Sequence, residues 1–188
     1  MIVGYRLSCW DNYGYMIDED KPSVFSKYNP CPQCGYIRDR TFIDRDVEIE
    51  KRQYDISYTL DGFLIVSEKF KQLFSEEEYP SIRYVKLNRY KNLYCLEIIG
   101  NILAFDAVKR QTEFINKCSA CGNCAEVIGA DPVYLKNINE PLAKGFYQTD
   151  LWFASFNRKH PLIIVDIETQ QKMKAQKYRM LTFNPISI

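Results

Sequence analysis

Two identical cysteine patterns constrain the fold of this chain more than any other feature. Both follow the pattern CxxCG, with cysteines at Cys31 and Cys34 in the first and at Cys118 and Cys121 in the second. A two-residue gap lets both thiolates of a pair face one metal ion, and the glycine that follows can adopt a positive φ. Two such pairs provide the four ligands of a tetrahedral Zn²⁺ site. We therefore predict a zinc ion bound by Cys31, Cys34, Cys118 and Cys121.

The two pairs are unusually far apart. The 83 residues between Cys34 and Cys118 exceed the roughly 15–20 that separate the pairs of an ordinary zinc ribbon. A shared metal would close a long loop and clip the N-terminal segment to the second half of the chain. Because no linker separates the halves, we expect residues 1–188 to form one domain. Four thiolates leave no open coordination position, which favours a structural zinc over a catalytic one.

One of the remaining three cysteines is an alternative to Cys121 as the fourth ligand. Seven cysteines, an odd number, argue against a disulfide framework. Cys124 follows Cys121 at the same spacing and is an alternative fourth ligand. Cys95 lies in an apolar run and Cys9 in an opening strand, so we expect both to pack in the core. Redox-active dithiols are a further alternative, but neither pair occupies the strand-to-helix position of a thioredoxin-type site.

The hydrophobic pattern predicts an α+β fold, a single compact domain with a mixed or antiparallel sheet. Two strand-helix-strand units are expected. The first has a strand at 63–66, Ser67 as the N-cap, a helix at 68–74 and a strand at 82–87. The second has a strand at 162–165, Asp166 as the N-cap, a helix at 168–177 and a strand at 180–183. The charged segment 36–55 is predicted to be in part a solvated edge strand. The four cysteines add a zinc-ribbon-like staple.

Charge and motifs narrow the possible functions. With 25 Lys and Arg against 24 Asp and Glu, the net charge of +1 makes nucleic acid an improbable partner. The chain has no dinucleotide-binding, P-loop, GxSxG or HExxH motif, and His160 is its single histidine. We therefore predict that the protein is not an enzyme. The chain has no export signal and no apolar run of membrane-spanning length, so we expect a cytoplasmic protein without membrane contact.

The sequences CPQCG at 31–35 and CSACGNC at 118–124 resemble the bacterial double-CxxCG motif family. Segments 63–74, 94–114 and 161–186 are similar to that family and to related immunity-type domains encoded beside polymorphic toxins. The resemblance covers residues 25–188, with Asp106 matching an aspartate that ends a strand pair. The third thiol, Cys124, and the charged segment 36–55 depart from the pattern. The resemblance implies an immunity protein, stabilised by zinc, that binds and neutralises a cognate toxin. The resemblance does not identify the toxin.

Partner binding by such a protein would use aromatic and acidic side chains, the usual hot-spot chemistry of interfaces. The candidates are Glu76, Glu77, Glu78, Tyr79, Tyr84, Tyr90, Trp152 and Phe156. For each of them, a place in the core or on a solvated helix end is the alternative. The oligomeric state is left open.

Two other functions stay under consideration. A zinc-ribbon nucleic-acid binder would use basic residues next to tyrosines, either in the run Lys86 to Lys91 or in the cluster of Lys172, Lys174, Lys177 and Arg179. A zinc-stapled scaffold subunit would have no toxin partner.

Overall fold

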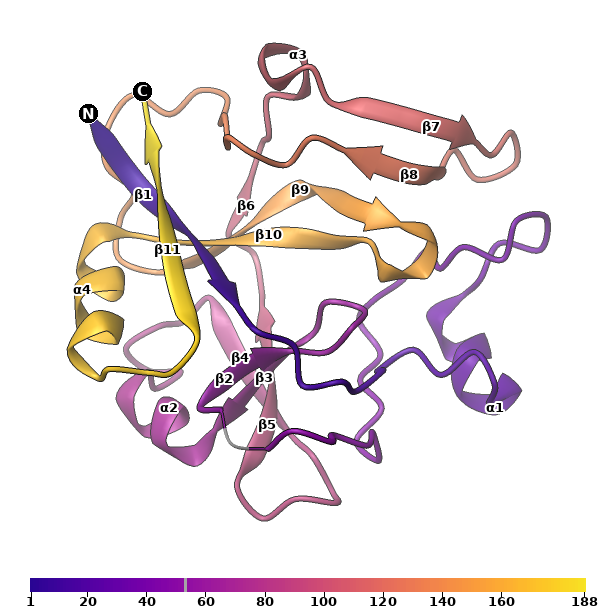
Figure 1. Ribbon diagram of the computed structural model, residues 1–188, viewed down its shortest axis with the longest axis horizontal. Coiled ribbons are helices and arrows are strands. Elements are labelled where there is room, and N and C mark those ends of the chain that lie inside the picture. Colours follow the sequence, from indigo (N-terminus) through magenta and orange to yellow (C-terminus); the bar gives the residue numbers. More distant parts are fainter. Residues whose placement is uncertain (53) are drawn as a thin grey trace.

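The computed structural model describes residues 1–52 and 54–188, and its main feature is two β-sheets that pack against each other (Figure 1). The larger sheet has the order β11-β1-β10-β9-β8-β7, with β6 paired to β9, and the smaller has the order β2-β3-β5-β4. All strand pairings within the sheets are antiparallel except β6–β9. The predicted α+β class with antiparallel sheets is thus confirmed.

Strands dominate and the helices are short. The larger sheet contains β1 (Ile2–Cys9), β6 (Ile102–Leu103), β7 (Glu113–Lys117), β8 (Cys124–Ile128), β9 (Phe146–Ser155), β10 (His160–Val165) and β11 (Leu181–Ser187). The smaller contains β2 (Ile56–Tyr58), β3 (Leu64–Ser67), β4 (Ile82–Lys86) and β5 (Leu93–Ile98). The helices are α1 (Pro22–Phe25), α2 (Glu68–Leu73), α3 (Ala107–Arg110) and α4 (Ile167–Ala175), with short 3₁₀ helices η1 (Ser26–Tyr28) and η2 (Phe156–Arg158).

The main core lies between the two sheets, and β3 and β10 are buried on both faces. Leu64 and Val66 of β3 belong to this shared core, whereas Ile65 belongs to a second core on the other face. In β10, alternate residues such as Ile163 and Ile164 divide in the same way between the shared core and a third core. Strands buried on both faces require continuous apolar runs, which explains why these two segments stand out in the sequence.

The outer face of the smaller sheet is covered by irregular chain. Residues 36–52 form no strand, so the edge strand predicted within 36–55 is wrong for this part of the segment. Its apolar residues are instead buried in the second core, with Val47 and Ile49 among them. A backbone group of this segment forms its hydrogen bond with a side chain instead of a neighbouring strand: the N–H of Ile49 donates to the hydroxyl of Tyr90 at 2.6 Å. The alternation of charged and apolar residues reflects burial of one side of the segment.

Two crossovers place a helix against the shared core. The hydroxyl of Ser67 caps α2 by accepting a hydrogen bond from the N–H of Phe70 at 3.3 Å, and the chain continues into β4. The carboxylate of Asp166 caps α4, which leads into β11. In each crossover the helix joins two strands that flank a third, antiparallel one: β5 lies between β3 and β4, and β1 lies between β10 and β11.

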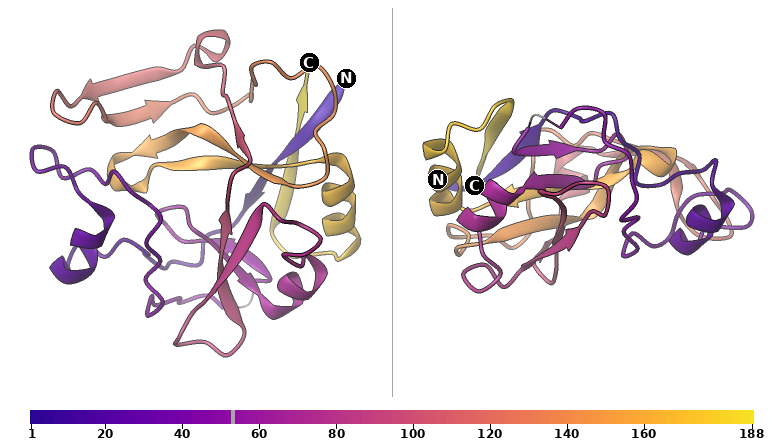
Figure 2. Two further views of the ribbon diagram at one scale, coloured as in Figure 1. Left: turned by 180° about the vertical axis from the view of Figure 1, so that it is seen from behind. Right: turned by 90° about the horizontal axis from the view of Figure 1, so that it is seen from below.

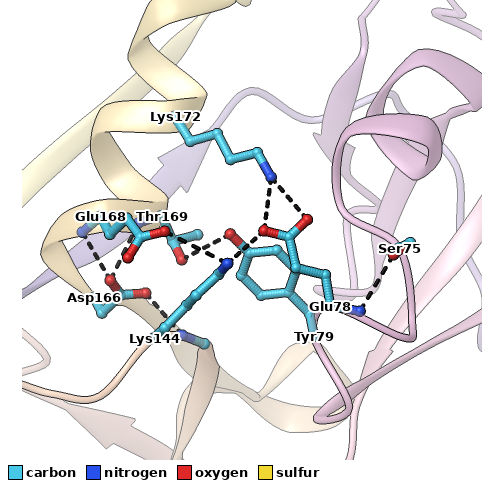
Figure 3. A network of polar contacts seen from close by, with 9 residues as sticks. Ser75, Glu78, Tyr79, Lys144, Asp166, Glu168, Thr169 and Lys172 are labelled. Atoms are coloured by element: carbon cyan, nitrogen blue, oxygen red, sulfur yellow. Dashed lines mark hydrogen bonds and ion pairs between the residues drawn. The ribbon is translucent and has the colours of Figure 1, made fainter.

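A polar network connects α4 to the turn that follows α2 (Figure 3). Asp166 accepts hydrogen bonds from the N–H groups of Glu168 at 2.7 Å and Gly145 at 2.8 Å. Glu78 pairs with Lys144 and with Lys172, the latter at 3.0 Å. The network therefore holds together three segments that are far apart in the sequence.

Candidate metal centre

The four cysteines of the two CxxCG motifs come together in space. The sulfur atoms of Cys31, Cys34, Cys118 and Cys121 all lie within 4.8 Å of one another. The Cys34 and Cys121 sulfurs are 3.7 Å apart. Four ligands about 2.3 Å from a tetrahedral zinc ion lie roughly 3.8 Å from each other, whereas a disulfide needs about 2.05 Å. The donor set and its spacing therefore fit a tetrahedral metal ion.

The two motifs adopt the same local backbone structure, which we call the first knuckle (31–36) and the second knuckle (118–123). In each, the N–H of the first cysteine donates to the carbonyl five residues later, and the N–H of the glycine donates to the carbonyl of the first cysteine. The distances are 2.9 and 2.8 Å in the first knuckle, and 2.7 and 2.9 Å in the second. Gly35 and Gly122 have φ values of 73° and 75°, which favour glycine. The second knuckle forms the turn between β7 and β8 (Figure 1).

Backbone N–H groups lower the pKa of one thiol in each knuckle. The backbone N–H of Cys34 is the main group that lowers the pKa of Cys31, to about 6, and the N–H of Gln33 acts in the same direction. The N–H of Cys121 is likewise the main group that lowers the pKa of Cys118. Burial has the opposite effect on the second cysteine of each knuckle, raising the pKa of Cys34 to about 12 and also raising that of Cys121. A divalent cation at the centre would favour the thiolate form of all four.

Two asparagines hold the knuckles in place. The side-chain oxygen of Asn157 accepts a hydrogen bond from the N–H of Ile37 at 2.8 Å, and its amide group donates to the carbonyl of Gly35 at 3.3 Å. The amide of Asn123, in the second knuckle, donates to the carbonyl of Ile37 at 3.2 Å. Sequence reasoning missed both residues, because an isolated asparagine carries no periodic signal.

A buried lysine lies beside the cluster. Lys159 is 7% exposed, and its ammonium group donates to the carbonyl of Phe156 at 2.7 Å and lies 4.6 Å from the centre of the Tyr36 ring. Among the described residues, no carboxylate forms an ion pair with it. Burial lowers the pKa of Lys159, and the neighbouring thiols of Cys124 and Cys34 oppose that effect. A divalent metal with four thiolates carries a net charge of −2, which this cation would partly neutralise.

The other cysteines lie outside the cluster. Cys124 is the first residue of β8 and is buried in the third core with Val127 and Leu162. The structure thus groups Cys121, and not Cys124, with the other three sulfurs. Cys95 is buried in the second core, as predicted, and its burial raises the pKa of the thiol. Cys9 is half-buried and packs against the shared core.

Two of the candidate partner-binding residues are interior. Tyr79 is 1% exposed and packs against Phe74 and Phe146 in the shared core. Tyr90 is 9% exposed, and its hydroxyl accepts the hydrogen bond from Ile49 described above. Both rings fill the core between structural elements, so neither offers a contact surface in this structure.

The remaining candidates have varied surroundings. Of the three exposed glutamates, Glu77 has no hydrogen bond or ion pair among the described residues, whereas Glu78 belongs to the network of Figure 3. Glu76 accepts a hydrogen bond from the N–H of Tyr84 at 2.8 Å. Trp152 is half-buried, with the Arg40 guanidinium 5.4 Å from its ring centre. Two further aromatic candidates differ in exposure: Tyr84 is half-buried, and Phe156, next to the first knuckle, is 56% exposed.

Comparisons of the chain with family models, with characterised proteins and with solved structures found no match. Within residues 1–52 and 54–188, no helix is both long and apolar enough to cross a membrane. The fold and the site together define an α+β protein of two packed sheets with a four-cysteine cluster suited to a metal ion.

Proposed function

We propose that the four-cysteine cluster binds a structural Zn²⁺ ion, and that the chain is a non-enzymatic, cytoplasmic immunity-type protein that binds and neutralises a cognate bacterial toxin. The observation that carries the proposal is the convergence of four sulfurs from two distant knuckles. Thiolates prefer soft or borderline metals, and zinc takes four of them tetrahedrally without redox chemistry.

A structural role for the ion follows from its ligands. With four sulfurs bound, zinc has no position left for water or substrate. The Nδ1 atom of the single histidine, His160, lies 2.8 Å from the carbonyl oxygen of Arg158, and its ring is tilted by 35° to the ring of Tyr58, with 5.7 Å between the ring centres. Among the described residues, no hydrogen bond joins His160 to a carboxylate, hydroxyl or thiol that would complete a catalytic group. A closed metal site and an isolated histidine support a binding protein over an enzyme.

The metal site would also preorganise an exposed aromatic side chain. Phe156 begins η2 and lies 6.0 Å, between ring centres, from Tyr36 of the first knuckle. Asn157, its neighbour, is hydrogen-bonded to that knuckle. A rigid exposed ring loses little entropy when a partner covers it, which favours tight binding. We assign Phe156 to the partner-binding face, and the toxin identity of the partner rests on the resemblance of the CxxCG motifs.

Three of the seven basic residues considered for nucleic-acid binding form ion pairs or hydrogen bonds within the chain. Lys172 pairs with Glu78 at 3.0 Å, and Arg89 pairs with Glu48 at 3.4 Å. The ammonium group of Lys86 donates to the carbonyl of Lys91. Phosphate contacts would have to compete with these interactions, so toxin binding is the better-supported function.

The test is a tagged pull-down from the native host with nuclease treatment, followed by mass spectrometry and an inhibition assay with the purified partner. We expect one stoichiometric, nuclease-resistant toxin whose activity the protein blocks. Phe156→Ala should weaken capture, whereas Ile102→Ala, which changes another exposed apolar residue, should not. Recovery of RNA or DNA that is lost at high salt would contradict the proposal in favour of a nucleic-acid binder. A stoichiometric partner that the protein does not inhibit would indicate a scaffold subunit.

A further inference from the structure

Apart from the two-residue strand β6, which pairs only with β9, the two sheets end in four edge strands, and three of these are covered or interrupted. Beside β2, the N–H of Tyr58 donates to the carbonyl of Trp10 at 2.9 Å, so that edge is paired with residues 10–12. On β4, the outward N–H of Tyr84 is occupied by the carboxylate of Glu76. On β11, Pro185 offers no N–H group. These are common means of preventing strand-to-strand association.

The fourth edge, β7, is open. β7 pairs only with β8, so one side of the strand has no partner strand. In an antiparallel ladder, alternate residues direct their backbone N–H and C=O groups to opposite sides of the strand, so some of these groups in β7 point away from β8. In the described part of the chain, no hydrogen bond reaches the outward groups. Figures 1 and 2 show β7 at the rim of the sheet with no ribbon beyond it.

We propose that β7 pairs with β7 of a second copy of this chain, antiparallel and about a twofold axis at Ile115. In this register Glu113 lies opposite Lys117 of the second copy, and the reciprocal pair forms on the other side of the axis. A parallel in-register pairing would instead align like charges, which is unfavourable across strands. The charge pattern of the strand is thus complementary to itself in one orientation.

Exposed apolar side chains accompany this edge. Phe114 is 51% exposed, although it lies opposite the buried Val127 in the β7–β8 register. In the proposed pairing, the two copies of Phe114 lie on one face of the joined sheet, diagonally across the axis, at a spacing of about 7–8 Å that aromatic side chains can bridge. Pairing would therefore shield both rings from water.

The backbone of β7 sets the size of this contact. Asn116 has a φ of 51°, which bends the strand after Ile115, yet Lys117 keeps its register opposite Cys124. The contact is centred on Ile115 and spans a single five-residue strand from each copy. Such a small interface produces a reversible dimer whose population depends on concentration.

The experiment is sedimentation velocity of the full chain across a wide concentration range, with the metal content of every variant measured in parallel. We expect the wild type to shift from monomer to dimer as its concentration rises. Glu113→Lys should raise the dissociation constant about tenfold, since it creates a like-charge contact on both sides of the axis. The double variant Glu113→Lys with Lys117→Glu restores opposite charges and should dimerise like the wild type.

Two further variants sharpen the test. Phe114→Ser removes the exposed ring that pairing would shield, and should raise the dissociation constant while the protein keeps its fold. Glu140→Lys makes the same change in net charge on an exposed residue outside β7 and should not affect dimerisation. A wild type that stays monomeric at every concentration would overturn the proposal. So would a dimer that responds equally to Glu113→Lys and Glu140→Lys, or one that the double variant fails to restore.

Discussion

The sulfur of Cys34 lies 3.7 Å from the sulfur of Cys121, 87 positions further along the chain. This contact joins the irregular N-terminal segment, which covers the smaller sheet, to the β7–β8 hairpin at the rim of the larger one. The two segments are hydrogen-bonded to each other near the knuckles by few groups, such as Asn123 to Ile37. A metal ion bound by the four cysteines would therefore be the main link between the two segments, and its loss should loosen both.

Loss of one ligand should destabilise the fold. We expect Cys31→Ser or Cys118→Ser to release the metal and lower the free energy of unfolding by several kcal/mol, since structural zinc contributes on the order of 10 kcal/mol in isolated fingers. Chemical denaturation with circular dichroism measures this. Cys95→Ala and Cys124→Ala remove thiols outside the cluster and should retain the metal. A Cys124→Ala protein without metal would show that the ligand assignment is wrong.

Removal of the lysine charge beside the cluster should weaken metal binding. Lys159→Met keeps most of the aliphatic packing but leaves the anionic cluster without its buried cation, so we expect at least a severalfold loss of zinc affinity. Lys159→Arg retains the charge and serves as the matched variant. Competition titration with a zinc chelator gives both affinities. Equal losses in the two variants would mean that packing, and not charge, explains the effect.

The cap of α4 should be a stability determinant. Asp166 is buried and accepts hydrogen bonds from the N–H groups of Glu168, Thr169 and Gly145. Asp166→Ala leaves these donors without a partner and should cost about 1–3 kcal/mol in urea denaturation. The exposed ion pairs of Glu78 are screened by solvent, so Glu78→Gln should cost less than Asp166→Ala. A larger loss for Glu78→Gln than for Asp166→Ala would contradict this ranking.

Stability should depend on pH through the single histidine. Burial lowers the pKa of His160 below its usual value of 6.5, and Arg40 and Arg6 act in the same direction, while the carbonyl of Arg158 and Asp61 oppose it. The unfolded chain therefore takes up a proton at higher pH than the folded chain. The free energy of unfolding should fall as the pH drops through about 6.5 towards the lower folded-state pKa.

His160→Gln isolates this effect. The difference in unfolding free energy between the wild type and the variant, both with metal bound, should shrink steadily as the pH falls below about 6.5. A difference that stays constant from neutral to mildly acidic pH would show that His160 has an unperturbed pKa.

The packing of the same histidine provides a further check. A side chain at Gly62 would place its Cβ 2.1 Å from the His160 ring, and Gly62 has a φ of 82°. Gly62→Ala should therefore destabilise the fold by more than the roughly 1 kcal/mol typical of point variants. Thermal unfolding measures the loss, and an unchanged melting temperature would contradict the close packing.

Parts of this structure were predictable because the responsible interactions are local. The helix caps Ser67 and Asp166 were expected from their place between an apolar run and a helical pattern, and the helices begin directly after them. Each CxxCG motif is likewise recognised from five consecutive residues, and the two were expected to pair because each supplies two of the four thiolates that a tetrahedral zinc site takes. Each of these inferences depends on a few neighbouring residues.

Sequence reasoning failed where contacts with distant segments of the chain determine the local structure. Ile49 alternates with charged residues, yet it belongs to a core built with β3 and β5, and no strand pairs with its backbone. Tyr79 and Tyr90 were candidates because tyrosine is common at interfaces. Both side chains are buried, because elements far away in the sequence pack against them. Nothing in the sequence distinguishes Lys159 from the other basic residues, and only the fold shows that its ammonium group is buried beside the knuckles.

The most direct test of the metal centre is elemental analysis of the purified wild-type protein, prepared without chelators, together with the Cys31→Ser variant. We predict one zinc ion per wild-type chain and almost none in the variant. A wild-type protein that is fully folded and contains no metal would contradict the central claim that a four-cysteine zinc site clips the two parts of this chain together.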